Sequence, residues 1–323
     1  MSPVRQALFR IPEALRRLLP SVSGNTVNGL GEPTPRRPSP IFWHIKRNMP
    51  FGELQQALFD RMDSEPGIRQ ALRSGDRGPT KPEPVAPVAV EKHPETWSAE
   101  VKRFALENEA ELVGIVKLDP LWVFEGYEVS EPWLIVLGAP MKYDRLSTAP
   151  DIAAGVEVIE TYNSGTRVAR KLANWIHRQG YCADAHGGPL AGPVNLIPAA
   201  LAAGFGELGK HGSIINRKLG SSFRLAAVRT DMPLVADRPD VFGADDFCAS
   251  CQLCSNACPP QAIFEQKQTV RGVRKWYVDF DKCIGYFHET YGCAICVAVC
   301  PWSRPGVAPS LAEKMTRRAA RRN

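Results

Sequence analysis

The residues of this 323-residue chain best suited to chemistry are its nine cysteines, which are unevenly placed. Eight of them lie between Cys248 and Cys300, and Cys182 stands alone. A disulfide framework spreads its cysteines over a small secreted domain, and residues 1–25 lack the continuous apolar run of a secretory signal. We therefore expect a reducing, cytoplasmic compartment in which the clustered thiols are metal ligands. Cys182 is expected to be a small buried hydrophobic residue.

The first cysteine motif has the spacing of an iron–sulfur ligand set. It runs C-x2-C-x2-C-x3-C-P from Cys248 to Pro259, which is the run found in bacterial two-cluster ferredoxins. Three thiolates at that spacing hold one cluster from a tight turn, and the fourth reaches the neighbouring cluster. A second motif, C-x2-C-x3-C-P, runs from Cys293 to Pro301 and lacks a standard first step. Cys283, ten residues upstream, must supply the missing ligand.

The eight thiols match two [4Fe–4S] clusters with none left over. Cluster one would be held by three cysteines of the first motif and the last of the second, namely Cys248, Cys251, Cys254 and Cys300. Cluster two would be held by the remaining four, namely Cys258, Cys283, Cys293 and Cys296. Soft thiolates also bind zinc, which is the alternative, but paired C-P motifs with interleaved ligands are typical of iron–sulfur proteins. Two adjacent clusters imply one-electron transfer through the protein.

The overall composition excludes several classes of protein. With 44% hydrophobic and 23% charged residues, the chain is neither collagen-like, mucin-like nor wholly disordered. No apolar run approaches the roughly 20 residues of an integral membrane span. The net charge of +6 divides into +3 for residues 1–20, +5 for residues 314–323 and −2 for the body. Because the body has no net positive charge, the composition argues against nucleic-acid binding.

The two basic ends are expected to be solvated and frayed. The alternative is that they dock to a membrane surface or an acidic partner. Residues 5–19 mix leucines with arginines, so a peripheral membrane helix is an option there.

Alternating strand and helix patterns must position the cysteines. Short apolar runs predict strands at 112–116, 133–137 and 223–229. Apolar periodicity and end signals predict helices at 51–62, 98–105, 155–178 and the start of 196–209. Linkers are expected at 20–42 and 76–95, where proline, glycine and polar residues gather. The alternation of strands with helices predicts an α/β core.

Two further motifs are incomplete. Asp184-Ala-His186-Gly-Gly-Pro189 is close to the D-x-H-x-x-G run that ligates cobalamin from below, but Pro189 replaces the last glycine. We therefore do not assign His186 to a metal. Gly204 to Gly209 matches G-x-G-x-x-G, but this run follows a helix rather than the strand that a dinucleotide site requires.

A longer pattern covers residues 95–305. A-G-F-G-E-L-G-K-H-G begins at Ala203, a G-x-x-x-R step ends at Arg224, and T-D-M-P-L begins at Thr230, all ahead of the paired cysteine motifs. In this order the pattern resembles the cobalamin-dependent reductive dehalogenases. The epoxyqueuosine reductases, which modify tRNA, share the Gly-Lys step at Lys210 and the Cys-Pro-Trp ending at Trp302.

The resemblance implies an α/β (α+β) fold in which a nitroreductase-like cobalamin-binding domain precedes a two-cluster ferredoxin-like domain. The expected division has four parts: an N-terminal arm with short helices and linkers (1–95), a cobalamin and substrate domain (96–245), a ferredoxin-like domain (246–305) and a basic C-terminal tail (306–323).

The resemblance also implies an iron–sulfur and cobalamin-dependent oxidoreductase. Electrons would pass from reduced ferredoxin, flavodoxin or a reductase through two [4Fe–4S] clusters to a base-off corrinoid, for reductive cleavage of a carbon–halogen or other carbon–heteroatom bond in a small substrate. Tyr162 matches the tyrosine that supplies a proton, and Lys210 and Arg224 are the cations expected to stabilise its phenolate. The residues expected to contact the corrinoid are Gly204, Gly206, Gly209 and His211.

Two other functions remain open. Epoxyqueuosine reductases carry an aspartate beside the matching tyrosine, where this chain has Thr161. That difference and the body charge of −2 count against a tRNA substrate, although the basic ends could serve one. The third possibility is a non-catalytic iron–sulfur electron carrier that kept the fold and lost the corrinoid.

Overall fold

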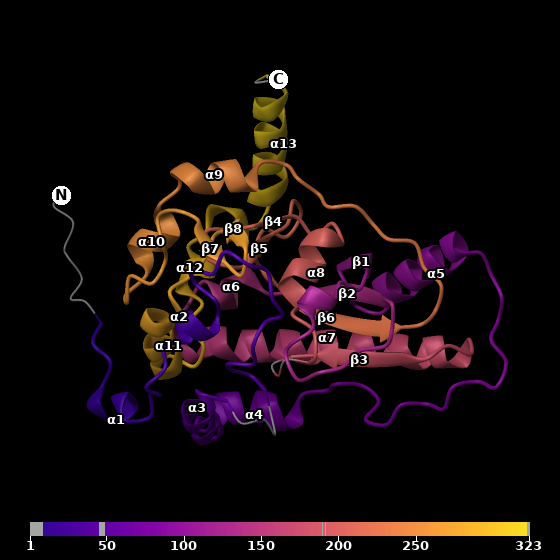
Figure 1. The fold of residues 1–323 in the computed structure, drawn as a ribbon, viewed down its shortest axis with the longest axis horizontal. Coiled ribbons are helices and arrows are strands. Elements are labelled where there is room, and N and C mark those ends of the chain that lie inside the picture. Colours follow the sequence, from indigo (N-terminus) through magenta and orange to yellow (C-terminus); the bar gives the residue numbers. More distant parts are fainter. Residues whose placement is uncertain (1–8, 45–48, 189, 191, 322–323) are drawn as a thin grey trace.

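A four-stranded antiparallel sheet in the order β1-β2-β6-β3 forms the centre of the protein (Figure 1). The computed structural model describes residues 9–44, 49–188, 190 and 192–321. The strands are β1 (Leu112–Lys117), β2 (Trp133–Pro140), β3 (Ala183–Gly187) and β6 (Phe223–Thr230). β1, β2 and β6 confirm the three predicted strands. β3 was not predicted, because this edge strand has a short, largely unburied sequence without an apolar run.

Helices cover both faces of the sheet. Successive residues of β2 point to opposite faces, so Ile135 and Leu137 join the core under α5 (Pro94–Glu107) and α7 (Ile152–Arg178). Leu134 and Val136 join a second core under α8 (Leu196–Ala202). Because β2 is buried on both faces, it reads as a continuous apolar run rather than an alternating one.

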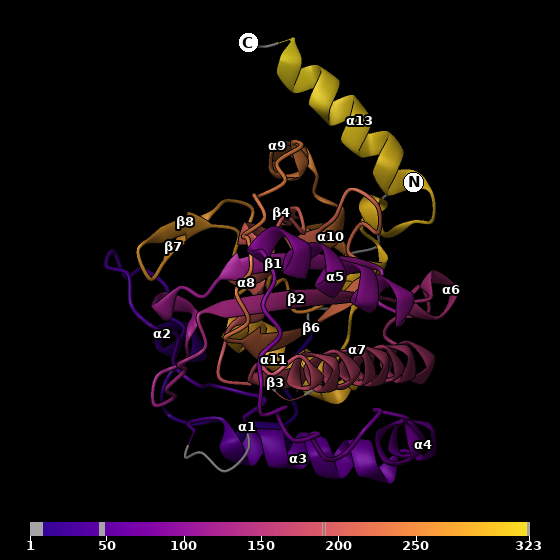
Figure 2. The same cartoon turned by 90° about the vertical axis from the view of Figure 1, so that its right-hand side faces the viewer.

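The N-terminal arm packs on the side of α7 that faces away from the sheet (Figure 2). Its helices are α1 (Glu13–Arg16), α2 (Gly24–Val27), α3 (Gly52–Ser64) and α4 (Pro66–Ser74). Leu58 and Ile68 from the arm share one core with Ile159 of α7 and Ile284 of the C-terminal region. The arm is therefore part of the folded body. Of the suggested peripheral helix at 5–19, residues 5–8 lie outside the described residues, and α1 forms the only described helix there.

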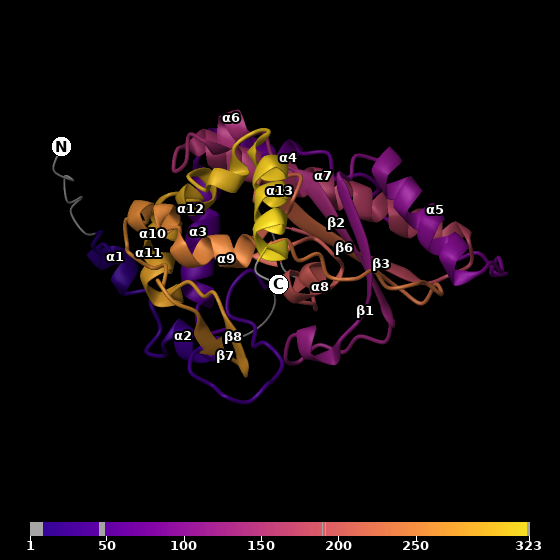
Figure 3. The same cartoon turned by 90° about the horizontal axis from the view of Figure 1, so that it is seen from above.

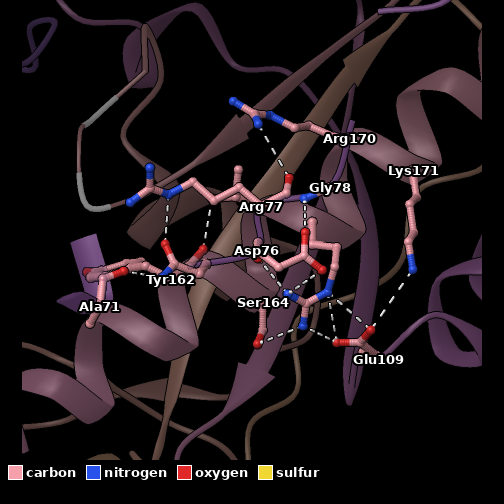
Figure 4. A network of polar contacts seen from close by, with 12 residues as sticks. Ala71, Asp76, Arg77, Gly78, Glu109, Tyr162, Ser164, Arg170 and Lys171 are labelled. Atoms are coloured by element: carbon pink, nitrogen blue, oxygen red, sulfur yellow. Dashed lines mark hydrogen bonds and ion pairs between the residues drawn. The ribbon is translucent and has the colours of Figure 1, made fainter. Parts of the chain in front are cut away.

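The segment after α4, expected as a linker, is irregular but fixed to α7 (Figure 4). Arg77 Nε donates a hydrogen bond of 2.7 Å to Asn163 Oδ1. Arg167 donates to the carbonyl of Asp76 at 2.5 Å and pairs with Glu109. These contacts hold α7, the helix that carries Tyr162, between the sheet and the arm.

The C-terminal region lies beside the sheet when the molecule is seen from above (Figure 3). Its elements are α9 (Ala244–Ser250), α10 (Leu253–Ala257), β7 (Gln268–Val270), β8 (Val273–Lys275), α11 (Phe280–Glu289), α12 (Ile295–Ala298), the 3-10 turn η2 (Pro301–Ser303) and α13 (Val307–Ala320). Shorter elements elsewhere are η1 (Pro120–Trp122), α6 (Tyr143–Leu146), β4 (Glu207–Leu208) and β5 (Ile214–Ile215). The predicted α/β (α+β) class is confirmed.

The C-terminal end differs from the expected frayed tail. Residues 307–320 form α13, and its buried Ala308, Ala312 and Met315 pack against the body. The expectation was wrong because these three small or flexible apolar residues recur at helical spacing and make a narrow inner stripe. Within the described residues, no helix is long and apolar enough to cross a membrane.

Candidate cluster sites and an adjoining cavity

Four cysteines from three separate segments line one cavity of about 320 Å³. They are the set predicted for cluster two, namely Cys258, Cys283, Cys293 and Cys296. Burial, followed by the neighbouring thiols of Cys293 and Cys258, raises the pKa of the Cys283 thiol to about 12. Without metal the Cys283 thiol would therefore stay protonated, and metal binding must displace its proton.

The four cysteines predicted for cluster one also come together. Cys248 lies on α9, Cys254 on α10, Cys251 between these helices and Cys300 directly before η2. Burial, together with the neighbouring thiols of Cys254 and Cys251, raises the pKa of Cys300 to about 12. The pKa of Cys248 is likewise raised to about 12 by burial, partly offset by a hydrogen bond from the backbone of Lys210.

The arrangement of the thiols suits a polynuclear cluster. In the described part of the chain, no three or more His, Cys, Asp or Glu side chains lie close enough together to hold a single metal ion. The second cysteine set instead lines a cavity. A [4Fe–4S] cluster is a body with four corners held by four thiolates, so ligands spread around a space fit it.

Tyr162 and Arg224 lie together at a second cavity, of about 310 Å³. The guanidinium carbon of Arg224 lies 5.8 Å from the centre of the Tyr162 ring. Arg224 also lines the cavity of the second cysteine set and a third cavity of about 220 Å³. Its Nε is buried and has no hydrogen-bond partner, which is rare for a buried polar atom. Arg224 therefore links the cluster-two region to the tyrosine.

Lys210 lies elsewhere, which corrects the expectation that it supports Tyr162. It is 1% exposed, its Nζ donates to the carbonyl of Cys251 at 2.9 Å, and it sits 5.0 Å from the ring centre of Trp276. Its charge thus faces the first cysteine set. The two cations come from different elements, since Lys210 follows β4 whereas Arg224 is part of β6.

The glycine-rich segment serves several different purposes. Gly206 (φ +118°) lines a cavity of about 690 Å³, and a Cβ there would lie 2.1 Å from the carbonyl oxygen of Ile215. Gly204 (φ +83°) follows the end of α8 in the left-handed conformation that favours glycine. A Cβ at Gly209 would lie 2.7 Å from the His211 ring, so this glycine makes room for the histidine.

His211 lines the cavity of the second cysteine set. Its Nδ1 accepts a hydrogen bond from the Ser213 backbone at 3.1 Å, and its Nε2 lies 3.3 Å from Ser221 Oγ. The Ser221 hydroxyl donates onward to the carbonyl of Ile214, so Nε2 carries the proton of the ring. Burial lowers the pKa of His211 to about 4, which keeps the imidazole neutral.

Two further residues at these cavities were not predicted from the sequence. Trp43, from the N-terminal arm, lines both cavities that contain Tyr162. No sequence signal connects Trp43 to Tyr162, because the arm is remote along the chain. His186 lines the larger of the two, and its Nε2 accepts from Arg229 Nε at 2.6 Å. Burial and then the Arg229 charge lower the pKa of His186 to about 4.

Glu207 joins the glycine-rich segment to the first cysteine set. Its Oε2 accepts hydrogen bonds from three successive backbone amides at the start of α9, at 2.7 to 2.8 Å, and Oε1 accepts a fourth at 3.2 Å. The donors are the amides of Phe242, Gly243, Ala244 and Asp245. A carboxylate here also complements the positive end of α9, the helix that carries Cys248.

Comparison with known proteins assigns the cysteine-rich segment. Residues 247–303, which contain all eight clustered cysteines, match the 4Fe-4S dicluster domain family. The chain is 34% identical over 210 residues to the tetrachloroethene reductive dehalogenase of Dehalobacter restrictus, covering 60% of this chain and 37% of that protein. The enzyme of the same name from Sulfurospirillum multivorans is 33% identical over 183 residues, covering 54% of this chain and 36% of that protein. Over 54–60% of its length, this chain is therefore similar to part of the tetrachloroethene reductive dehalogenases.

Other matches define the extent of this relationship. The solved structure of the catabolic reductive dehalogenase NpRdhA with 3-bromo-4-hydroxybenzoic acid covers 93% of this chain and 46% of its own length, with a TM-score of 0.70. At 23% identity this likeness shows the shared fold. An epoxyqueuosine reductase of Salmonella typhimurium is 32% identical over 154 residues, covering 42% of this chain and 36% of that protein. The chain spans little more than a third of the curated relatives it matches.

Cys182, expected to be buried, is exposed next to β3. Its own backbone amide donates to Asp231, and the charge of that carboxylate raises the pKa of the thiol. The expectation of a buried position was wrong, because β3 lies at the edge of the sheet and the residue before it is open to solvent.

Proposed function

We propose that this chain is an iron–sulfur and corrinoid-dependent oxidoreductase that reductively cleaves a carbon–halogen bond in a small organic molecule. The observation that carries the proposal is the place of Arg224, which lines both the cavity of the second cysteine set and the cavities that contain Tyr162. Electron delivery and proton delivery would thus meet at one point. The names of the relatives, which include tetrachloroethene reductive dehalogenases, support a halogenated substrate.

The cavities next to the second cysteine set fit a large, planar cofactor. The cavity of about 310 Å³ and the cavity of about 690 Å³ share Asn195 and Ile197 along their border. Gly206 and Gly212 line the larger cavity without side chains, so backbone and cofactor can approach closely. A solved reductive dehalogenase of the same fold is described for B12-dependent dehalogenation. When bound, the corrinoid would supply a low-valent cobalt as the reductant of the carbon–halogen bond.

The reaction would consume two electrons and one proton, R–X + 2e⁻ + H⁺ giving R–H + X⁻. The electrons would arrive singly through the two clusters. Tyr162 would donate its hydroxyl proton to the carbon that loses the halide, and the Arg224 guanidinium would stabilise the phenolate left behind. Trp43, which lines the same cavity, would help to exclude water.

The test is anaerobic purification of the full chain with cobalamin supplied, followed by iron and corrinoid analysis and halide release under reduced methyl viologen. We expect eight irons and one corrinoid per chain, as two [4Fe–4S] clusters and one cofactor require. Tyr162→Phe should keep both cofactors and lower turnover about 10²- to 10⁴-fold, as expected for loss of a general acid. Tyr181→Phe is the matched control, because its hydroxyl only contacts the carbonyl of Val90.

Three results would overturn parts of this proposal. Iron without corrinoid under these conditions would remove the corrinoid enzyme and favour a non-catalytic electron carrier. Unchanged turnover in Tyr162→Phe would remove the tyrosine as the acid. The Cys258→Ser variant should keep about half of the wild-type iron, and the Cys182→Ser variant should keep all of it. Equal iron in the two variants would refute the two ligand sets.

A second candidate is an epoxyqueuosine reductase-like tRNA-modifying enzyme, which the 32% identical relative supports. Thr161, beside Tyr162, is buried and donates its hydroxyl to the carbonyl of Glu157 at 2.8 Å. It therefore offers no second acid. Expression of the chain in a strain that accumulates epoxyqueuosine tests this candidate, since conversion to queuosine would favour it over dehalogenation. The proposal of a corrinoid-dependent oxidoreductase includes a cytoplasmic location and reduced ferredoxin, flavodoxin or a reductase as the electron donor.

A further inference from the structure

Helix α13 extends from the body of the protein and presents a basic outer face (Figure 2). Its inner stripe, Ala308, Ala312 and Met315, is buried. The exposed cations of this end of the chain are Arg304, Lys314, Arg317, Arg318 and Arg321. Between residues 301 and 321, Glu313 is the only acidic residue in the sequence, so this segment carries a clear positive excess.

The helix is anchored on the first cysteine set. Ala308, Ala312 and Met315 belong to the same core as Cys248, Cys300 and the intervening aromatic residues. The chain reaches α13 directly from Cys300 through η2, and α13 also packs against α9 (Figure 1). A protein bound to the outer face of α13 would therefore lie next to cluster one.

The chemistry of the outer face favours a protein partner over a bilayer. Between Val307 and Arg321, the exposed side chains are charged, polar, proline or alanine, and Leu311 packs inward. A peripheral membrane helix inserts large apolar side chains, which this face does not offer. Intramolecular pairing is partial, since Arg317 pairs with Glu313 and Arg318 lies 3.8 Å from Asp246. Lys314 and Arg321 add further exposed positive charge.

The position also determines the direction of electron flow. The second cysteine set adjoins the Arg224 and Tyr162 cavities, so under the proposed function, on which this inference rests, electrons leave from cluster two. Cluster one is then the entrance. We propose that the basic face of α13 is the docking surface for a small acidic one-electron carrier protein. Each reduced carrier gives up one electron, cluster one gains it, and two encounters supply the pair consumed per substrate.

The test measures the reduction of the clusters in the full chain, without corrinoid or substrate. The probe is a reduced, acidic, plant-type [2Fe–2S] ferredoxin, which is mixed with the oxidised chain in a stopped-flow instrument. The loss of visible absorption of the oxidised [4Fe–4S] clusters measures the rate of reduction. The Lys314→Glu/Arg321→Glu double variant should lower the second-order rate constant about tenfold or more at low salt, because steering by opposite charge raises association rates by 10- to 10³-fold. The wild-type rate should fall as salt is added.

The control variant is Arg69→Glu/Lys81→Glu, which makes the same charge change at two exposed positions. Arg69 is part of α4, which lies at the opposite end of the molecule from α13 (Figure 1), and Lys81 belongs to the segment after α4. It should keep the wild-type rate, and dithionite should reduce all three proteins equally. Equal rates for both double variants would overturn the proposal. The proposal would also be overturned if wild type, but not Lys314→Glu/Arg321→Glu, co-sedimented with phosphatidylserine vesicles while ferredoxin reduced both proteins at the same rate. Failure of the proposed function would be detected by a separate assay, as the absence of halide release with reduced methyl viologen.

Discussion

Replacement of Glu207 should remove the hydrogen bonds that join the glycine-rich segment to the start of α9, and so lower the stability of the fold. Its carboxylate, 9% exposed, accepts the four backbone amides that open α9. Glu207→Ala leaves three short hydrogen bonds and one longer one unmade, in a site with little access for water. A buried donor without a partner costs about 1–3 kcal/mol. Allowing for some relaxation, we expect the free energy of unfolding to fall by about 3–5 kcal/mol.

Glu207→Gln should cost less for a geometric reason. The single Oε2 atom accepts the three short bonds, and a glutamine carbonyl in that place keeps them as neutral hydrogen bonds. The amide NH₂ then faces the Asp245 backbone N–H, and the favourable charge at the start of α9 is lost. We expect a loss of about 1–2 kcal/mol.

Urea unfolding followed by tryptophan fluorescence measures these differences, and hydrogen exchange reports directly on the amides of residues 242–245. The exposed Glu107, at the end of α5, supplies the control Glu107→Ala, which should stay within about 0.5 kcal/mol of wild type. The amides should lose protection in the order wild type, Gln, Ala. A Glu207→Ala protein within 1 kcal/mol of wild type, with its four amides still protected, would refute the reasoning.

Two further predictions concern backbone crowding and pH. In Gly220→Ala the new Cβ would lie 1.8 Å from the carbonyl oxygen of Trp302 at φ +59°, so thermal melts should show a loss of more than about 2 kcal/mol. Gly31→Ala, at φ +86° with open space around it, should cost only the backbone strain of about 1 kcal/mol, and equal losses would contradict the clash. For His186, a folded pKa of about 4 against an ordinary 6.5 means that the unfolded chain binds the proton first. Stability should therefore be full above pH 6.5 and fall by at most about 3 kcal/mol towards pH 4; a His186→Asn protein with the same pH profile would show that another group is responsible.

The local patterns of the sequence were sufficient to predict the 4Fe-4S character of the cysteine-rich segment and most of the core. Ligand spacing within a cysteine motif is a property of a few adjacent residues, whereas the interleaving of Cys258 and Cys300 between two clusters stays a prediction. The strands β1, β2 and β6 and the helix α7 followed from apolar runs long enough to have a clear period. The edge strand β3 has no such run and was missed.

Relations between distant segments were decided by the tertiary structure alone. Lys210 and Arg224 are only 14 positions apart in the sequence, yet one faces the first cysteine set and the other faces Tyr162. Trp43 lines the Tyr162 cavity although it belongs to the N-terminal arm, to which the sequence assigned no part of the site. The C-terminal cations lie beside the first cysteine set only because α13 packs on α9 and η2. Composition and spacing describe neighbours along the chain, whereas the burial of apolar surface decides which segments meet in space.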